Sequence, residues 1–178
     1  AAVFVEQGVR WTWAEFAREV DALAGGLLAL GLEKGDRVGI WSPNRYEWLL
    51  TQFATARVGL VLVTINPAYR LSEVEYVLNK VQAKALVTAA SFKSSDYLGM
   101  VQTLAPELAS CAPGALQAER LPQLRAVIRV GEEQTPGMFN FDAVVDSGRQ
   151  TPGSVLDGIS ASLDPDDAIN VQFTSGTT

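Results

Sequence analysis

Short apolar runs alternate along the chain with longer segments in which apolar residues recur at helical spacing. The first and clearest helical segment places Phe16, Val20, Ala24 and Leu27 on one face. Strands joined by connections of helical length are typical of βαβ units. The pattern therefore predicts an α/β fold with a mostly parallel sheet and flanking helices. The strand-sized runs lie at 37–41, 60–65, 84–88, 124–130 and 169–174.

The start of the chain predicts a β-hairpin followed by a capped helix. Two short apolar stretches, Val3–Val5 and Val9–Trp11, flank a Gln-Gly pair, which is a turn signal. Thr12 and Glu15 have the spacing of a capping box, in which each side chain accepts a hydrogen bond from the other residue's backbone N–H. We expect the helix to begin here, with Trp13 as the first member of its buried face.

The run Leu60–Ile65 predicts an internal strand. It is almost wholly apolar and rich in Val and Leu. Strands of parallel sheets read this way because helices cover both of their faces. Asn66-Pro67 then breaks the strand, and we interpret Asn66 as a turn former rather than a ligand contact.

Local signals also place several other helix boundaries. Ser42-Pro43-Asn44 is expected to start a second helix, because proline is tolerated in a first turn. Ser72 and Glu75 repeat the capping-box pattern, for a helix that reaches about Lys80. Three segments remain, of which the first is expected to be one helix and the others short helices or loops: 95–108, 139–147 and 152–159.

The last ten residues predict a strand that runs into a ligand-binding loop. Ile169, Val171 and Phe173 alternate with polar residues, as in a half-buried strand. The stretch Thr174-Ser175-Gly176-Thr177-Thr178 follows, with four hydroxyls around one glycine. Such a loop can aim N–H and hydroxyl donors at one point, and glycine allows close approach to the backbone. A phosphate chain is the natural ligand of this geometry, although the loop does not match the Walker A pattern.

Composition narrows the classes of function. Of the 178 residues, 48% are hydrophobic and 19% charged, as in an ordinary globular domain with a real core. The net charge of −6 disfavours nucleic acid as a partner. The single cysteine, Cys111, rules out an internal disulfide and fits a reducing compartment. Because the chain has no histidine, it cannot by itself form a Ser-His-Asp or Cys-His pair, and a zinc site is disfavoured. No apolar run approaches the ~20 residues of a membrane span.

Three landmarks, in order, resemble the AMP-forming acyl-CoA synthetases of the adenylate-forming superfamily. The first is Trp11–Phe16 with the helix that ends at Gly31, and the second is Ala56–Pro67 with the helix that follows. The third is Phe173–Thr178, which is similar to the start of the family's phosphate-binding loop. The resemblance covers essentially the whole chain. Ile65–Tyr69 and Pro113–Leu116 look most like the medium-chain fatty-acyl-CoA synthetase branch.

The resemblance implies an enzyme that joins a fatty acid to ATP, releases pyrophosphate and then transfers the acyl group to CoA. It implies ATP, Mg²⁺ and CoA as ligands, a fatty acid as the small-molecule substrate, and a cytoplasmic setting, with the mitochondrial matrix as the alternative. It is compatible with a homo-oligomer. Residues 1–178 would be the N-terminal portion of the adenylation domain, with the catalytic residues beyond Thr178, so we expect the chain alone to be inactive. The residues assigned to nucleotide binding are Thr174, Ser175, Gly176, Thr177 and Thr178; none is assigned to catalysis or to a metal.

Two other classes of function remain open from the residues alone. One is a different carboxylate-adenylating enzyme, such as an aryl-CoA synthetase or a peptide-synthetase adenylation domain. The other is a non-enzymatic α/β interaction module whose Ser/Thr-rich tail is disordered. Asp164, Asp166 and Asp167 are interpreted as a solvated turn rather than a metal site. A dinucleotide-binding oxidoreductase is disfavoured because no G-x-G-x-x-G follows a strand.

Overall fold

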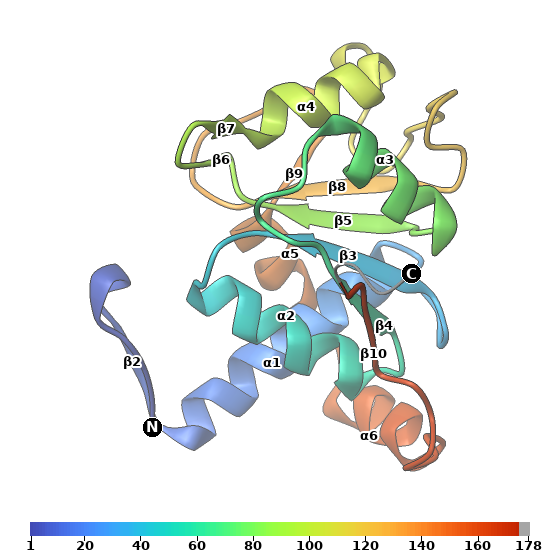
Figure 1. Ribbon diagram of the computed structural model, residues 1–178. Coiled ribbons are helices and arrows are strands. Elements are labelled where there is room, and N and C mark those ends of the chain that lie inside the picture. Colours follow the sequence, from blue (N-terminus) through green and yellow to red (C-terminus); the bar gives the residue numbers. More distant parts are fainter. Residues whose placement is uncertain (175–178) are drawn as a thin grey trace.

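The computed structural model describes residues 1–174 and is built around a parallel six-stranded sheet (Figure 1). The strand order is β10-β4-β3-β5-β8-β9, and every neighbouring pair is parallel. The predicted α/β fold with a mostly parallel sheet is therefore confirmed. The strands are β3 (Arg37–Trp41), β4 (Val61–Thr64), β5 (Ala85–Thr88), β8 (Ala126–Arg129), β9 (Phe139–Asn140) and β10 (Asn170–Gln172).

Helices cover both faces of the sheet. Successive residues of a strand point to opposite faces, so Ile40 enters one core and Trp41 the other, and both are fully buried. The helices on the Ile40 face are α1 (Trp13–Ala29), α2 (Tyr46–Arg57), α5 (Phe141–Gly148) and α6 (Gly153–Ala161). Those on the Trp41 face are α3 (Leu71–Lys80), α4 (Tyr97–Leu104) and the 3₁₀ turn η2 (Pro106–Ala109).

Strand β4 is internal, as its apolar run predicts. It lies between β3 and β10, and Leu62 and Val63 are fully buried on its two faces. The regular strand is shorter than the apolar run. Leu60 and Ile65 lie just beyond its two ends, and both are buried. The expectation of a strand covered on both faces is confirmed.

The N-terminal hairpin and the first helix also follow the sequence. Strands β1 (Ala2–Phe4) and β2 (Val9–Trp11) pair antiparallel, although Val5 lies in the 3₁₀ turn η1 (Val5–Gln7) between them rather than in a strand. Thr12 Oγ1 accepts the N–H of Glu15 at 3.2 Å, and the Glu15 carboxylate accepts the N–H of Thr12 at 2.7 Å. The predicted capping box is therefore present.

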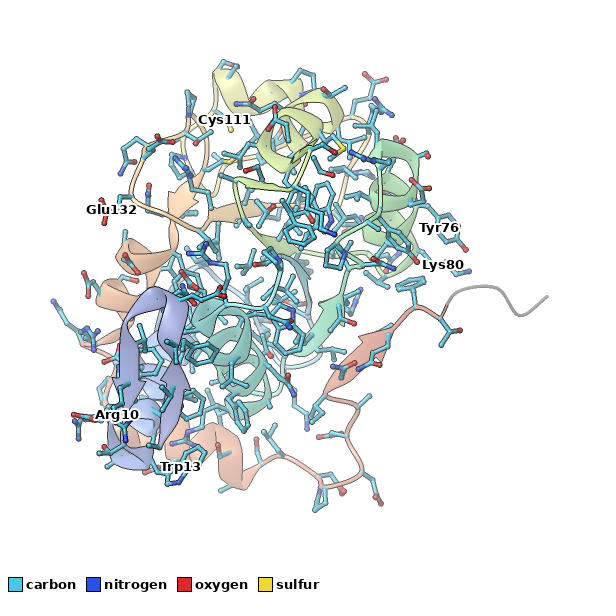
Figure 2. All side chains as sticks on the ribbon, turned by 60° about the vertical axis from the view of Figure 1, so that its left-hand side comes forward. Arg10, Trp13, Tyr76, Lys80, Cys111 and Glu132 are labelled. Atoms are coloured by element: carbon cyan, nitrogen blue, oxygen red, sulfur yellow. The ribbon has the colours of Figure 1, made fainter. Side chains whose placement is uncertain are left out.

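Trp13 does not belong to the buried face of α1. It is 67% exposed at the first position of the helix and meets Phe16 edge-on at 6.2 Å. Figure 2 shows its side chain at the edge of the molecule. The expectation that Trp13 is buried was wrong: its side chain lies outside the core cluster that Phe16 and Val20 of the same helix enter.

Glycines allow α1 and α5 to cross at very short range. A methyl group on Gly148 of α5 would overlap the carbonyl oxygen of Ala22 and the backbone nitrogen of Gly26 in α1. A methyl on Gly26 would likewise overlap the carbonyl oxygen of Val144. The two backbones are therefore in direct contact, which residues with a Cβ would prevent.

The second helix begins at Tyr46 rather than at Ser42-Pro43-Asn44. Arg45 is still extended, with φ −148° and ψ 163°. The side chain of Gln7, from the N-terminal hairpin, accepts the N–H of Tyr46 at 2.8 Å and donates to Glu47 at 2.9 Å. The helix is thus capped by a residue far away in sequence, which no local signal could reveal.

The start of α3 also differs from the prediction. The helix begins at Leu71, and the Glu73 carboxylate accepts the N–H of Arg70 at 3.1 Å. Ser72 donates its hydroxyl to Glu73 instead of capping the helix. The predicted Ser72–Glu75 capping box is therefore wrong.

The predicted single helix over 95–108 is divided. Ser95 belongs to a small hairpin formed by β6 (Ser91–Phe92) and β7 (Ser95–Asp96). Asp96 caps α4 by accepting the N–H of Gly99 at 2.9 Å. Pro106 lacks the N–H that would continue the helix, so α4 ends at Leu104 and gives way to η2.

Candidate functional site

The carboxyl ends of β3, β4 and β10 lie at the same edge of the sheet. The connection after β3 leads to α2 on one face, whereas the connection after β4 leads to α3 on the other. Neighbouring loops that diverge in this way open a crevice, which is where ligands bind in open α/β sheets. The topology therefore places the candidate site at this edge.

Strand β10 brings the first predicted site residue to this edge. Gln172 pairs in register with Thr64 of β4, so the segments that leave the two strands start side by side. Thr174 follows as an exposed residue beside a hollow of about 450 Å³. Figure 2 shows Tyr76 projecting from α3 on the side where β10 ends. The hollow is lined by Tyr69, Ser72, Glu73, Tyr76, Val77, Phe173 and Thr174.

The other four predicted site residues, Ser175, Gly176, Thr177 and Thr178, lie outside the described residues. Their assignment to phosphate binding stays a prediction. Thr174 itself lies just beyond the carboxyl end of β10, at the edge of the sheet where the topology places the candidate site.

The connection from β4 to α3 forms one wall of this site. Asn66 shapes it: its side-chain oxygen accepts the N–H of Ala68 at 2.9 Å, and its carbonyl accepts the N–H of Tyr69 at 3.0 Å. The interpretation of Asn66 as a turn former is thus confirmed. Tyr97 donates its hydroxyl to the carbonyl of Pro67 at 2.6 Å. Sequence reasoning missed Tyr97, since nothing local in the sequence indicates a partner 30 residues away.

A second hollow lies nearer to the N-terminal hairpin. Its volume is about 500 Å³, and Phe4, Asn44, Arg45 and Phe92 are among its lining residues. The guanidinium of Arg45 is paired with Glu47 at 2.8 Å, which raises the pKa of Arg45. The main cation lining this second hollow is therefore already neutralised by a carboxylate within the fold.

The acidic turn at 164–167 precedes β10 and is held by hydrogen bonds between its own residues. Asp164 accepts the N–H of Asp166 at 2.9 Å, and Asp167 accepts the N–H of Asp164 at 3.0 Å. Asp167 also pairs with Lys34 at 2.7 Å. Within residues 1–174, no group of three or more His, Cys, Asp or Glu side chains could hold a metal ion.

Replacing Asp167 by asparagine should slightly destabilise the domain at neutral pH. Lys34 and the N–H of Asp164 hold the pKa of the Asp167 carboxyl below its usual range. A carboxyl group whose pKa is lowered by folding contributes stability at pH values above its unfolded pKa, which is about 4 for aspartate. This contribution is lost as the pH falls through that value and below it. Urea unfolding at pH 7 should therefore show a slightly lower midpoint for Asp167→Asn than for wild type, and the two should converge in acid. The matched control Asp166→Asn changes the same charge in the same turn. A midpoint equally lowered by both substitutions would assign the effect to net charge.

The structure is an α/β domain whose parallel sheet is covered on both faces and whose edge strand leads into a hydroxyl-rich sequence. A family model described as "AMP-binding enzyme" matches residues 1–178. The chain therefore belongs to the AMP-binding enzyme family, and the resemblance found in the sequence is confirmed.

Curated relatives are similar over the whole chain. The medium-chain acyl-CoA ligase ACSF2, mitochondrial, of Danio rerio is 48% identical over 178 residues, which are 100% of this chain and 29% of the relative. The putative acyl-CoA synthetase YngI of Bacillus subtilis (strain 168) is 39% identical over 178 residues, which are 100% of this chain and 32% of the relative. The chain thus spans about a third of the length of these relatives.

Solved structures agree with the fold. A long-chain-fatty-acid-CoA ligase (FadD1) from Archaeoglobus fulgidus matches with a TM-score of 0.68 and 26% identity, over 93% of this chain and 28% of that one. The resemblance of the sequence to the medium-chain branch is confirmed by its similarity to the medium-chain acyl-CoA ligase ACSF2. No helix within residues 1–174 is both long and apolar enough to cross a membrane.

Proposed function

We propose that the complete protein is an AMP-forming fatty-acid–CoA ligase. The observation that carries the proposal is the 48% identity to a medium-chain acyl-CoA ligase over the full length of this chain. In the proposed reaction the carboxylate of the fatty acid attacks the α-phosphorus of ATP, forming an acyl-adenylate and releasing pyrophosphate. The thiol of CoA then attacks the acyl carbon, and AMP leaves.

The role that we propose for this chain is to hold the triphosphate of ATP. A carboxylate is a poor electrophile, and adenylation gives its acyl carbon a good leaving group. Donors fixed in advance around the β- and γ-phosphates stabilise the negative charge that shifts onto pyrophosphate. We assign this role to the hydroxyls and N–H groups of Thr174, Ser175, Gly176, Thr177 and Thr178. The sheet edge supports the assignment by bringing Thr174 to the end of a strand paired with β4.

Mg²⁺ would enter this site with the triphosphate and neutralise part of its charge. Among residues 1–174 no group of three or more His, Cys, Asp or Glu side chains could hold it, and a Mg²⁺ bound mainly through substrate phosphates and water is common in ATP-using enzymes. Thr174 and the other hydroxyls of the assigned stretch are oxygen donors of the type that Mg²⁺ accepts.

We further propose that residues 1–178 form the N-terminal portion of the adenylation domain and that the rest of the longer protein contributes the acid-binding pocket. For the compartment, the vertebrate relatives are named as mitochondrial, which supports the mitochondrial matrix over the cytoplasm.

The complete protein should catalyse ATP–pyrophosphate exchange that depends on an added fatty acid. The half-reaction needs no CoA, so it isolates adenylation. A panel of saturated acids from short to long chain, with benzoate and amino acids beside them, should give the highest exchange rate with medium-chain acids. Highest exchange with benzoate or with an amino acid would instead favour an aryl-CoA synthetase or a peptide-synthetase adenylation domain. No exchange with any acid would favour a non-enzymatic module.

A further inference from the structure

The wall of the candidate site is fastened to the Trp41 face of the sheet by two side chains. The wall is the connection Asn66–Arg70, which joins β4 to α3. Tyr97 donates its hydroxyl to the Pro67 carbonyl at 2.6 Å, and Arg70 donates to the Ser95 hydroxyl at 2.8 Å. Both ends of the connection are therefore anchored to the short segment where β7 runs into α4.

Tyr97 is the more deeply buried of the two anchors. Its side chain is fully buried, and its ring stacks on the equally buried ring of Trp41, with centroids 3.9 Å apart and an interplanar angle of 17°. Burial raises the pKa of the Tyr97 hydroxyl, which favours its protonated, hydrogen-bond-donating form. Trp41 is the last residue of β3, so this anchor is built directly onto the central sheet.

The anchored connection lies next to the start of the proposed phosphate-binding stretch. Tyr69 of the connection lines the same hollow as Phe173 and Thr174. The register between Gln172 and Thr64 keeps the ends of β10 and β4 level. A shift of the connection would therefore change the surroundings of Thr174, where the chain enters the site.

We propose that Tyr97 is a positioning residue for nucleotide binding, acting through the Pro67 carbonyl on the wall that faces Thr174. The proposal rests on the ligase function proposed above. Tyr97 touches neither substrate nor reacting atoms; it holds the wall in place before ATP arrives. Without the anchor, part of the binding free energy is spent on ordering the wall.

Tyr97→Phe keeps the stacked ring and removes only the hydroxyl. In the complete protein it should raise the KM for Mg·ATP in ATP–pyrophosphate exchange by about two- to tenfold, the equivalent of one lost hydrogen bond. The KM for the fatty acid should stay within about twofold of wild type, since the wall borders the phosphate stretch. The matched control is Thr103→Val, which removes a hydroxyl-to-carbonyl bond of 2.7 Å that lies wholly within α4.

A purely structural role would give a different result. It would lower the melting temperature and change both KM values and kcat together, or it would give Tyr97→Phe and Thr103→Val the same KM for Mg·ATP. Either result overturns the proposal.

Hydrogen exchange tests the same inference without enzymatic activity. In Tyr97→Phe the amides of Ala68 and Tyr69, which bond to Asn66, should exchange faster than in wild type. In Thr103→Val the same two amides should exchange at the wild-type rate. If wild type shows no ATP–pyrophosphate exchange, the proposed function fails, and unchanged amide exchange in Tyr97→Phe would overturn the anchoring role independently.

Discussion

Replacing Gly148 by alanine is expected to destabilise the domain by about 3 kcal/mol or more, at or beyond the upper end of the usual cost of overpacking. The added methyl would overlap two backbone atoms of α1, the carbonyl oxygen of Ala22 and the nitrogen of Gly26. Backbone cannot change rotamer, so the two helices must separate along their shared core. Urea unfolding followed by circular dichroism would measure the loss.

The control for this substitution is Gly158→Ala in α6. A Cβ at Gly158 meets no heavy atom within 4 Å. Alanine there removes the entropic cost of glycine in a helix and should stabilise the domain by about 0.5–1 kcal/mol. Two identical chemical changes are therefore predicted to have opposite signs. A Gly148→Ala variant as stable as wild type would show that α1 and α5 do not cross at this range.

Replacing Leu62 by aspartate should unfold the domain. Leu62 is fully buried in β4 between two neighbouring strands. An ionised carboxylate there would have no partner, and the penalty of several kcal/mol is comparable with a total stability of about 5–15 kcal/mol. The melting curve of the complete protein would show the loss of its cooperative transition or a much lower midpoint.

Val155→Asp is the matched control for that substitution. Val155 is 45% exposed in the first turn of α6, where a negative charge also suits the helix dipole. It should leave the melting temperature nearly unchanged. If Leu62→Asp behaved in the same way, β4 would have to be an edge strand and the strand order would be wrong.

The parts of the fold that local chemistry determines could be predicted from the sequence. The Thr12–Glu15 capping box and the apolar run of β4 are signals carried by neighbouring residues, and both are confirmed. Helix α2 could not be placed correctly, because its first N–H is bonded by Gln7 of the hairpin. The close crossing of α1 and α5 left one trace in the sequence, the pair Gly25-Gly26 inside a helical pattern, where glycine is costly unless a neighbour needs the space.

The candidate site divides in the same way. The composition of the stretch from Thr174 onwards suggested phosphate binding directly, and the alternation before it predicted the strand that leads there. The pairing of β10 with β4 depends on a long-range contact, so the neighbourhood of Thr174 could not be derived. Tyr97 escaped notice for a related reason: its partner is a backbone carbonyl, which has no signature in the amino-acid sequence.

The crossing of α1 and α5 also sets a schedule for the chain during its synthesis. Helix α1 leaves the ribosome early, but the glycine-containing helix that covers it is made more than a hundred residues later. At about 5–20 residues per second, translation alone separates the two by roughly 6–25 s. During this interval α2 and the strands that share its core can cover part of the apolar face of α1, but the side that meets α5 stays uncovered. The nascent chain therefore carries an open hydrophobic surface that chaperones can recognise, and this surface closes only when α5 emerges.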